Sequence, residues 1–352
     1  MKILHLICAA RPNFMKIAPL YHALKAENWC TPKIVHTGQH YDYQMSQAFF
    51  DDLDLPAPHY HLGVGSGSHA EQTAQTMLAY EKLCLSEHKP DLVIVVGDVN
   101  ATIACSIAAK KLNLKISHLE AGLRSFDRTM PEEINRILTD SICDYHWTPS
   151  EDADENLLRE GIQIKQISRV GNIMIDAYCL MKNKIEAQET WNRFQLSKKE
   201  YAVLTLHRPV NVDNCSELSR ILGTIGKLDK SVVFPVHPRT KKTLESLGNL
   251  SKNIKLVEPM GYVEFMSLVS EAKYVITDSG GLQEETTYLN IPCFTLRDTT
   301  ERPITITLGS NQLTNVDNLL EKIENLKQGQ VPPLWDGATA SRIVQVLKDA
   351  FQ

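Results

Sequence analysis

Short apolar runs alternate with longer segments of helical periodicity along most of the chain. In the first half, the runs that predict strands are Ile3–Cys8, Lys33–His36, Leu92–Val96, Lys115–Leu119, Tyr145–Thr148 and Gln166–Val170. The segments between them that predict helices include Ala70–Ser86, Thr102–Leu112, Pro131–Cys143 and Ser150–Glu160. Because runs as apolar as Leu92–Val96 suit a parallel sheet that is covered on both faces, the alternation predicts a doubly wound α/β domain.

The alternation stops after Val170 and then begins again. A polar helical stretch, rich in Lys, Glu and Gln, extends to about Lys199. Further strands are predicted at Tyr201–Leu206, Ser231–Val236, Ile254–Val257, Tyr274–Thr277 and Cys293–Leu296, and a terminal helix at Thr339–Phe351. We therefore predict two Rossmann-like domains, at residues 1–171 and 172–335, followed by a terminal helical segment at 336–352.

Composition narrows the class of protein. The 352 residues suffice for two domains at roughly 100–200 residues each. The net charge is -5 and both signs are mixed along the chain, which argues against a nucleic-acid or polybasic membrane partner. The eight cysteines form no CxxC pair and are interpreted as reduced core residues. No apolar run reaches the roughly 20 residues of a membrane span, and the first run is interpreted as a strand instead of a signal peptide, so we expect a cytoplasmic location.

Two Rossmann-like domains leave a cleft between them, and ligands bind beyond the carboxyl ends of parallel strands. The first strand is followed by Arg11 and Lys16 and by no glycine. This basic pair suits a diphosphate, although two solvated surface cations are an equally good interpretation. The run from Gly63 to Ser68 begins like GxGxxG but ends in Ser68, which favours a mobile loop capped by that serine over a dinucleotide site.

Carboxylates follow the next strands. Asp98 and Glu120 come directly after Leu92–Val96 and Lys115–Leu119, and Glu132 opens a helix on the same face as Arg136. The helix dipole suffices to explain one acidic residue at a helix start. Three carboxylates that converge on one cleft instead indicate acid–base chemistry.

The second half carries an anion-binding pattern. Strands are followed by two His-Arg pairs and by a glycine turn that opens a helix, where backbone N–H groups bind phosphate and a nearby carboxylate can hold ribose hydroxyls. These residues are His207, Arg208, His237, Arg239, Asp278, Ser279, Gly280, Gly281, Glu284, Glu285, Arg297, Glu301 and Arg302. No Cys/His cluster or serine-hydrolase pattern occurs, so no metal is expected.

Nine motifs in fixed order resemble the non-hydrolysing UDP-N-acetylglucosamine 2-epimerases and span residues 9 to 303. They are ARPNFMKIAPL, TGQHYD, GDVNAT, EAGLRS, PEEINRILTD, TLHRP, PVHPRT, TDSGGLQEE and LRDTTERP. The resemblance implies a glycosyltransferase-B architecture, in which two Rossmann-like domains face a central cleft and a C-terminal helix returns to the first domain. It also implies a UDP-sugar substrate, and we expect a homodimer without a cofactor.

The resemblance also implies roles for single residues. Asp98, Glu120 and Glu132 would be acid–base groups beside Arg136, and His207 would lie near the sugar–diphosphate oxygen. The residues that would bind substrate are Arg11, Lys16, His237, Ser279, Gly280, Gly281, Glu285 and Arg302. Gln39, His40 and Arg208 match positions tied to a second, regulatory UDP-sugar in some members.

The chain departs from the commonest family pattern after His207. Many members continue His-Arg-Arg-Glu-Asn, whereas this chain has Pro209-Val210 in place of the second Arg and the Glu. Another UDP-2-acetamido sugar therefore remains an alternative substrate. A UDP-sugar transferase, a hydrolysing epimerase and a non-catalytic sensor remain alternative functions.

Overall fold

The computed structural model describes residues 1–38, 50, 52–248 and 250–351. The chain divides into two compact units. Unit 1 comprises Met1–Leu180 and Pro333–Gln352, and unit 2 comprises Met181–Pro332.

The described part of unit 1 forms a seven-stranded parallel sheet with the order β3-β2-β1-β4-β5-β6-β7. The strands are β1 (Lys2–Cys8), β2 (Cys30–His36), β3 (Tyr60–His61), β4 (Leu92–Val96), β5 (Lys115–Leu119), β6 (Tyr145–Thr148) and β7 (Ile167–Arg169). β1 pairs with β2 on one side and β4 on the other, so the order of the strands reverses between β1 and β4. Every side chain of β4 is buried, which fits a sheet that is covered on both faces.

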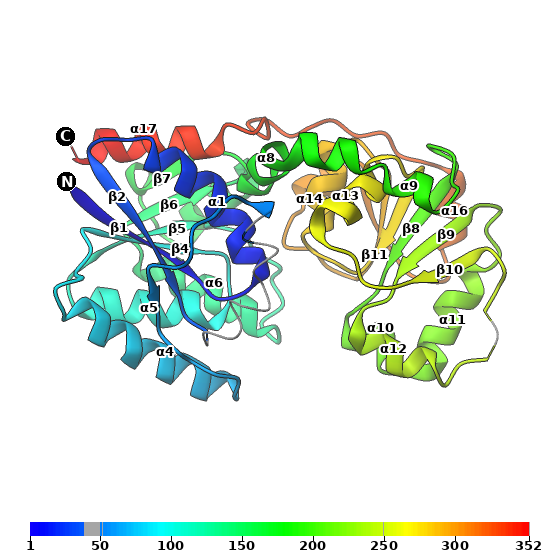
Figure 1. Ribbon diagram of the computed structural model, residues 1–352, viewed down its shortest axis with the longest axis horizontal. Helices are drawn as coiled ribbons and strands as arrows, with labels where there is room; N and C mark the ends of the chain where they lie inside the picture. The colour runs from blue at the N-terminus through cyan, green and yellow to red at the C-terminus, as the bar shows by residue number, and fades with distance from the viewer. Residues whose placement is uncertain (39–49, 51, 249, 352) are drawn as a thin grey trace. The chain divides into compact units, whose positions relative to one another are not determined.

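Helices cover both faces of this sheet (Figure 1). One layer contains α4 (His69–Cys84), α5 (Asn100–Lys111) and α6 (Pro131–Ile142), which pack on one another. On the other face α1 (Arg11–Lys25) packs against the C-terminal helix α17 (Thr339–Phe351). α7 (Glu151–Arg159) follows β6, and a 3-10 turn, Ile164–Gln166, precedes β7. As predicted, Ser68 caps α4: its Oγ accepts from the N–H of Glu71 at 3.2 Å.

The division between the units falls within α8 (Ile173–Gln188), beyond the predicted boundary at 171/172. The first turns of α8 hold the returning C-terminal segment, because the carboxylate of Asp176 accepts from the N–H groups of Thr339 and Ala340 at 3.1 and 2.8 Å. Trp335 Nε1 also donates to the carbonyl of Pro149 at 3.0 Å. The helical stretch after Val170, which the sequence predicts to be polar, therefore begins with a buried turn of α8 that packs on unit 1.

Unit 2 repeats the topology, with a six-stranded parallel sheet of order β10-β9-β8-β11-β12-β13 in its described part. The strands are β8 (Tyr201–Thr205), β9 (Ser231–Pro235), β10 (Ile254–Val257), β11 (Tyr274–Thr277), β12 (Cys293–Leu296) and β13 (Asn311–Thr314). The helices are α9 (Thr190–Arg193), α10 (Pro209–Val212), α11 (Cys215–Ile225), α12 (Pro238–Leu244), α13 (Tyr262–Ser270), α14 (Leu282–Tyr288), α15 (Ile304–Thr307) and α16 (Leu319–Glu324). In this sheet the order reverses between β8 and β11.

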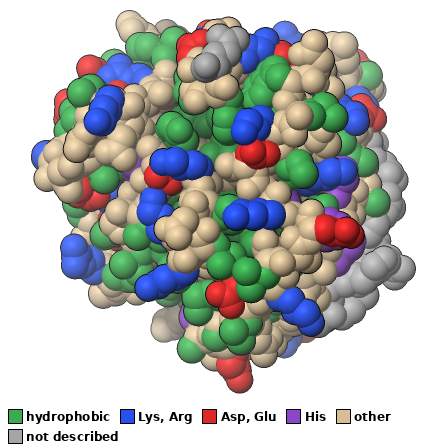
Figure 2. All heavy atoms as spheres, turned by 90° about the vertical axis from the view of Figure 1, so that its left-hand side faces the viewer, with side chains coloured by type: hydrophobic (Ala, Val, Ile, Leu, Met, Phe, Trp, Pro, Cys, Tyr) green, Lys and Arg blue, Asp and Glu red, His purple; other side chains and the backbone are tan. Residues whose placement is uncertain are grey.

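Lys and Arg side chains are interspersed with Asp and Glu side chains over the face drawn in Figure 2. On this face the two signs of charge are mixed, as they are along the sequence. Among the described residues, no helix combines the length and the apolar character that a membrane span requires.

Candidate active site

The turn between β1 and α1 is closed by an asparagine. Oδ1 of Asn13 accepts from the N–H groups of Ala9 and Ala10 at 3.2 and 3.1 Å. Its Nδ2 donates to the carbonyl of Val96, at the end of β4, at 3.2 Å. Asn13 therefore ties the two strands together where their order reverses, the position at which α/β sheets bind ligands. Sequence reasoning missed this residue; the signal was an asparagine in the first turn of the helix.

Lys16 lies one turn further along α1 and forms a buried ion pair with Oε2 of Glu120. A Cβ atom on Gly97, the first residue after β4, would lie 3.2 Å from Lys16 Nζ and 3.5 Å from Glu120 Oε2. Lys16 is therefore held by a carboxylate at the switch point and is not a solvated surface cation. Arg11 begins α1, and its side chain lies outside the described part of the structure.

Glu120 combines two unusual features. Its backbone φ is +72°, a left-handed conformation that costs a non-glycine residue about 1–3 kcal/mol. The residue is only 5% exposed, and Oε1 has no hydrogen-bond partner among the described residues. Burial of a carboxylate oxygen without a donor costs free energy, and a fold usually tolerates that cost only where the oxygen has a function. These features favour a functional role for Glu120.

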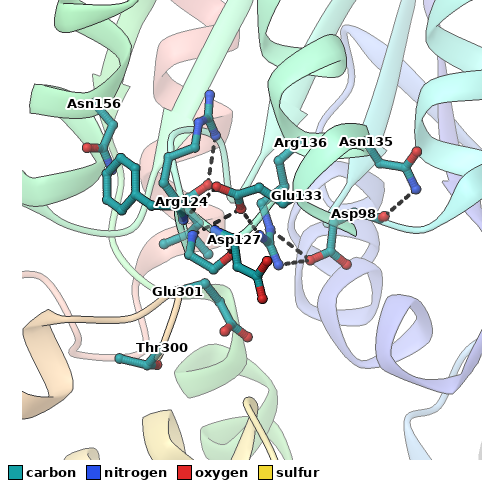
Figure 3. A network of polar contacts seen from close by, with 12 residues as sticks. Asp98, Arg124, Asp127, Glu133, Asn135, Arg136, Asn156, Thr300 and Glu301 are labelled. Carbon is teal, nitrogen blue, oxygen red and sulfur yellow. Dashed lines mark hydrogen bonds and ion pairs between the residues drawn. The ribbon is translucent and has the colours of Figure 1, made fainter. Parts of the chain in front are cut away.

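Asp98 belongs to an ion-pair network on the same side of unit 1 (Figure 3). Arg136, on α6, donates from Nε to Asp98 Oδ2 at 2.9 Å, and its Nη1 pairs with buried Glu133. Glu133 in turn accepts from the N–H groups of Ser125 and Phe126 at 3.0 and 2.8 Å. The structure thus brings Asp98 and Arg136 together. It adds Glu133, whereas the sequence predicted a role for the adjacent Glu132.

Glu132 is exposed and lines a pocket of about 340 Å³ that also includes Asp98 and Asn135. Ala9 and Ala10 contribute to the same wall. Two of the three predicted carboxylates therefore share a pocket. Glu120 is not among the lining residues and lies beside Gly97, the residue that precedes Asp98.

In unit 2 the buried Asp278 follows β11 and organises the turn after β8. Its carboxylate accepts from the N–H groups of His207 and Arg208 and from Asn211 Nδ2, at 3.0, 2.9 and 3.0 Å. Burial alone would raise the pKa of Asp278, but the hydrogen bond from His207 and its positive charge lower it. His207 Nδ1 lies 2.7 Å from Asp278 Oδ1, and the His207 side chain is 44% exposed.

His237 caps α12, where its Nδ1 accepts from the N–H of Arg239 at 3.2 Å. The His237 and His207 rings lie 5.9 Å apart. Partial burial, with the charge of His207, lowers the pKa of His237. The structure thus brings together the two histidines that the sequence predicted.

The glycine turn before α14 faces a cluster of charges. A Cβ atom on Gly280 would lie 2.6 Å from Glu301 Oε1 and 3.3 Å from Arg302 Nη1. Arg302 pairs with both Glu301 and Glu284, at 2.6 and 2.7 Å. Arg297 pairs with Glu301 at 2.8 Å, while its buried Nη1 has no hydrogen-bond partner among the described residues.

Glu285 lies buried on α14 and accepts from the hydroxyl of Tyr262 at 2.6 Å. Burial raises the pKa of Glu285 to about 7. The negative charge of Glu284 also raises it, whereas the hydrogen bond from Tyr262 lowers it. Ser279 begins the turn, and its N–H donates to Thr277 Oγ1 at 2.9 Å. Of the predicted regulatory residues, Gln39 and His40 lie outside the described residues, so only Arg208 is placed.

The fold and the residues after its strands define the class: an α/β protein of two Rossmann-like domains, as predicted. The crystal structure of Methanocaldococcus jannaschii UDP-GlcNAc 2-epimerase in complex with UDP-GlcNAc and UDP matches this chain with a TM-score of 0.88 and 42% identity, over 99% of each chain.

The sequence comparisons define the family. The model of the UDP-N-acetylglucosamine 2-epimerase family matches residues 22–348. UDP-N-acetylglucosamine 2-epimerase of M. jannaschii is 44% identical over 363 residues, 98% of each chain. UDP-2,3-diacetamido-2,3-dideoxy-D-glucuronate 2-epimerase of Pseudomonas aeruginosa is 40% identical over 319 residues, 89% of this chain and 88% of its own. The chain belongs to the UDP-N-acetylglucosamine 2-epimerase family, a family of isomerases.

Proposed function

We propose that the protein interconverts UDP-N-acetylglucosamine and UDP-N-acetylmannosamine by inverting C2 of the sugar. Family membership over nearly the whole chain supports the reaction class. The observation that carries the catalytic assignment is Glu120, a buried carboxylate with one open oxygen, beside Lys16 and the Gly97 turn.

The chemistry restricts the route. The proton on C2 of an N-acetylhexosamine is not next to a carbonyl, so direct removal is prohibitively slow. Elimination of UDP breaks the C1–O bond as the C2–H bond breaks, and yields 2-acetamidoglucal. Return of a proton to the opposite face of C2 and addition of UDP to C1 give the epimer. This route needs a base, an acid and cations for the departed UDP, and it needs neither NAD nor a metal.

The carboxylates of unit 1 supply the base and the acid in this proposal. Glu120 has the open, buried oxygen, whereas Asp98 is oriented by Arg136 and Glu132 lines the pocket beside it. We leave the order of their roles open because interacting acids share protons. Lys16, with Arg11, would face the diphosphate.

Unit 2 would hold UDP. Asp278 orients His207 through Nδ1, and the His207 ring would lie near the diphosphate oxygen that leaves C1 and later returns to it. His237, Ser279, Gly280, Gly281 and Arg302 would surround the diphosphate, and Glu285 would hold the ribose. A carboxyl group with a pKa near 7 can accept or donate a hydrogen bond to a hydroxyl, which suits that role.

A second candidate substrate is another UDP-2-acetamido sugar. The Pseudomonas aeruginosa relative acts, by its name, on a diacetamido glucuronate, and it is nearly as similar as the first relative. Pro209-Val210, which replaces the commoner Arg-Glu, begins α10 next to His207. Parallel assays with both UDP-sugars decide between them.

The test is incubation of the purified protein with UDP-N-acetylglucosamine alone in D2O, followed by proton NMR. We expect UDP-N-acetylmannosamine that carries deuterium at C2, because a carboxylate that holds the proton between half-reactions exchanges it with water. Free N-acetylmannosamine with UDP would indicate a hydrolysing epimerase. UDP released only when an acceptor is added would indicate a transferase, and binding without turnover would indicate a sensor.

The proposal also includes a homodimer and a cytoplasmic location. Analytical ultracentrifugation and cell fractionation test these two points separately from the reaction.

A further inference from the structure

A buried histidine–aspartate pair lies behind the two turns that carry Asp98 and Glu120. His118 lies on β5 and Asp140 lies in the last turn of α6, and both are fully buried. His118 Nδ1 lies 2.6 Å from Asp140 Oδ1, and Nε2 donates to the carbonyl of Gly97 at 2.8 Å. None of the roles proposed above uses this pair.

The bonds of His118 orient its ring. A carbonyl oxygen only accepts, so Nε2 carries the proton that is donated to Gly97, and Nδ1 faces the carboxylate of Asp140. Burial alone would raise the pKa of Asp140, but His118 and Arg124 lower it to about 2. Two further side chains hold Asp140 in place. Arg124 Nη2 lies 2.7 Å from Asp140 Oδ2, and His146 Nε2 donates to the backbone oxygen of Asp140 at 2.8 Å.

The second carboxylate oxygen of Asp140 reaches the other turn. Oδ2 accepts from the N–H of Gly122 at 3.0 Å. Gly122 has a φ of +80°, and a Cβ atom there would lie 2.3 Å from the carbonyl of Ala153, so the turn requires glycine. Glu120, two residues earlier, has the left-handed backbone that its surroundings must maintain. The His118–Asp140 pair therefore holds both the turn after β4 and the turn after β5.

We propose that His118 and Asp140 are positioning residues for the epimerisation. By fixing the carbonyl of Gly97 and the N–H of Gly122, the pair sets the relative placement of the Asp98 and Glu120 carboxylates. The inference rests on the proposed function, although the bonds themselves do not depend on it. Neither side chain touches the substrate; both act through the backbone of the turns.

Two substitutions of His118 separate its two bonds. In His118→Gln the amide can still donate to the carbonyl of Gly97, whereas in His118→Asn it can reach only Asp140. We expect kcat to fall by about 10- to 100-fold in His118→Asn and by less in His118→Gln, because small displacements of catalytic groups have large effects on rate. KM and the UDP affinity should stay within about twofold of the wild type.

His146→Asn is the matched control. His146 pairs with His118 in the sheet register and is equally buried, but its ring bonds the backbone of α6. It should lose thermal stability, as the His118 variants do, while its kcat stays near that of the wild type. Equal kcat in His118→Asn and the control would overturn the inference, as would a loss of UDP affinity in step with stability.

A second measurement needs no variant enzyme to be active. In the wild-type protein labelled with 15N-histidine, Nε2 of His118 should carry a proton that exchanges slowly with solvent, because it is buried and bonded to the carbonyl of Gly97. An unprotonated Nε2 would overturn the inference even if the His118 variants fail to fold. If the wild type does not epimerise any UDP-sugar while this bond is present, the proposed function fails and the bond stands.

Discussion

Gly97→Ala tests whether the turn after β4 places the carboxylates that are proposed to be catalytic. Gly97 has a φ of +66°, and a Cβ atom there would meet Lys16 Nζ at 3.2 Å and Glu120 Oε2 at 3.5 Å. The first distance is a few tenths of an ångström tighter than an ordinary contact, so the ammonium must move, and the buried Lys16–Glu120 pair must shift with it.

Two effects of this substitution can be estimated separately. A non-glycine residue in the left-handed region costs about 1–2 kcal/mol of stability. For a unit of this size that corresponds to a fall in the melting temperature of roughly 2–8 °C. Displacement of the ion pair changes the position of the Glu120 carboxylate, and a shift of several tenths of an ångström should lower kcat by about tenfold or more.

Gly161→Ala is the matched control. Gly161 also has a positive φ, +88°, but a Cβ atom there would have no atom within 4 Å. Both variants should lose similar stability in calorimetry, and only Gly97→Ala should lose kcat in the NMR assay of C2 epimerisation. A normal kcat in Gly97→Ala, or an equal loss in Gly161→Ala, would refute the reasoning.

Further outcomes test the remaining assignments. Glu120→Gln and Asp98→Asn should each lose about 10²–10⁴-fold in kcat while still binding UDP, as expected for general acid–base groups; near-normal turnover in both would make these carboxylates structural. Gly280→Val places a side chain against Glu301 and should weaken UDP binding in calorimetry by about tenfold, or ~1.4 kcal/mol; unchanged affinity in a folded variant would remove this turn from the site. Because the pKa of Glu285 is raised to about 7 in the folded state, its contribution to stability is complete below about pH 4.5 and is lost as the pH rises through 7. Glu285→Gln should therefore melt higher than the wild type at pH 8, with the difference shrinking toward pH 5; a constant difference would contradict the shift. Turnover should need no added NAD or metal and should survive EDTA, and tightly bound NAD in the purified protein would contradict the elimination route.

Most strands of the two sheets could be predicted from sequence because they lie in continuous apolar runs, such as Leu92–Val96, that alternate with helical segments. The two strands that were missed, β3 (Tyr60–His61) and β13 (Asn311–Thr314), lie at sheet edges, where a strand needs little apolar surface. β2 begins earlier than predicted, at Cys30, and contains Pro32. Among the described residues, β3 pairs with Val35 and His36 alone, so Pro32 lies at an edge of this part of the sheet, where a residue without an N–H donor is tolerated.

The candidate site was predictable only in part. The rule that ligands bind beyond the carboxyl ends of strands located Asp98, Glu120 and Asp278, because that rule depends on chain order alone. The resemblance placed Arg136 beside these carboxylates, and Arg136 does pair with Asp98. The supporting residues Glu133, which pairs with Arg136, and Asn13, which bonds the end of β4, were not predictable, because a sequence does not encode the distances that bring them to the site.

The structure changes how the cations of the site are interpreted. The sequence suggested open positive charges for a diphosphate, yet Lys16 is paired with Glu120, and Arg302 with two glutamates. Such pairing holds donors in place before an anion arrives, which is the preorganisation that stabilises a departing charge.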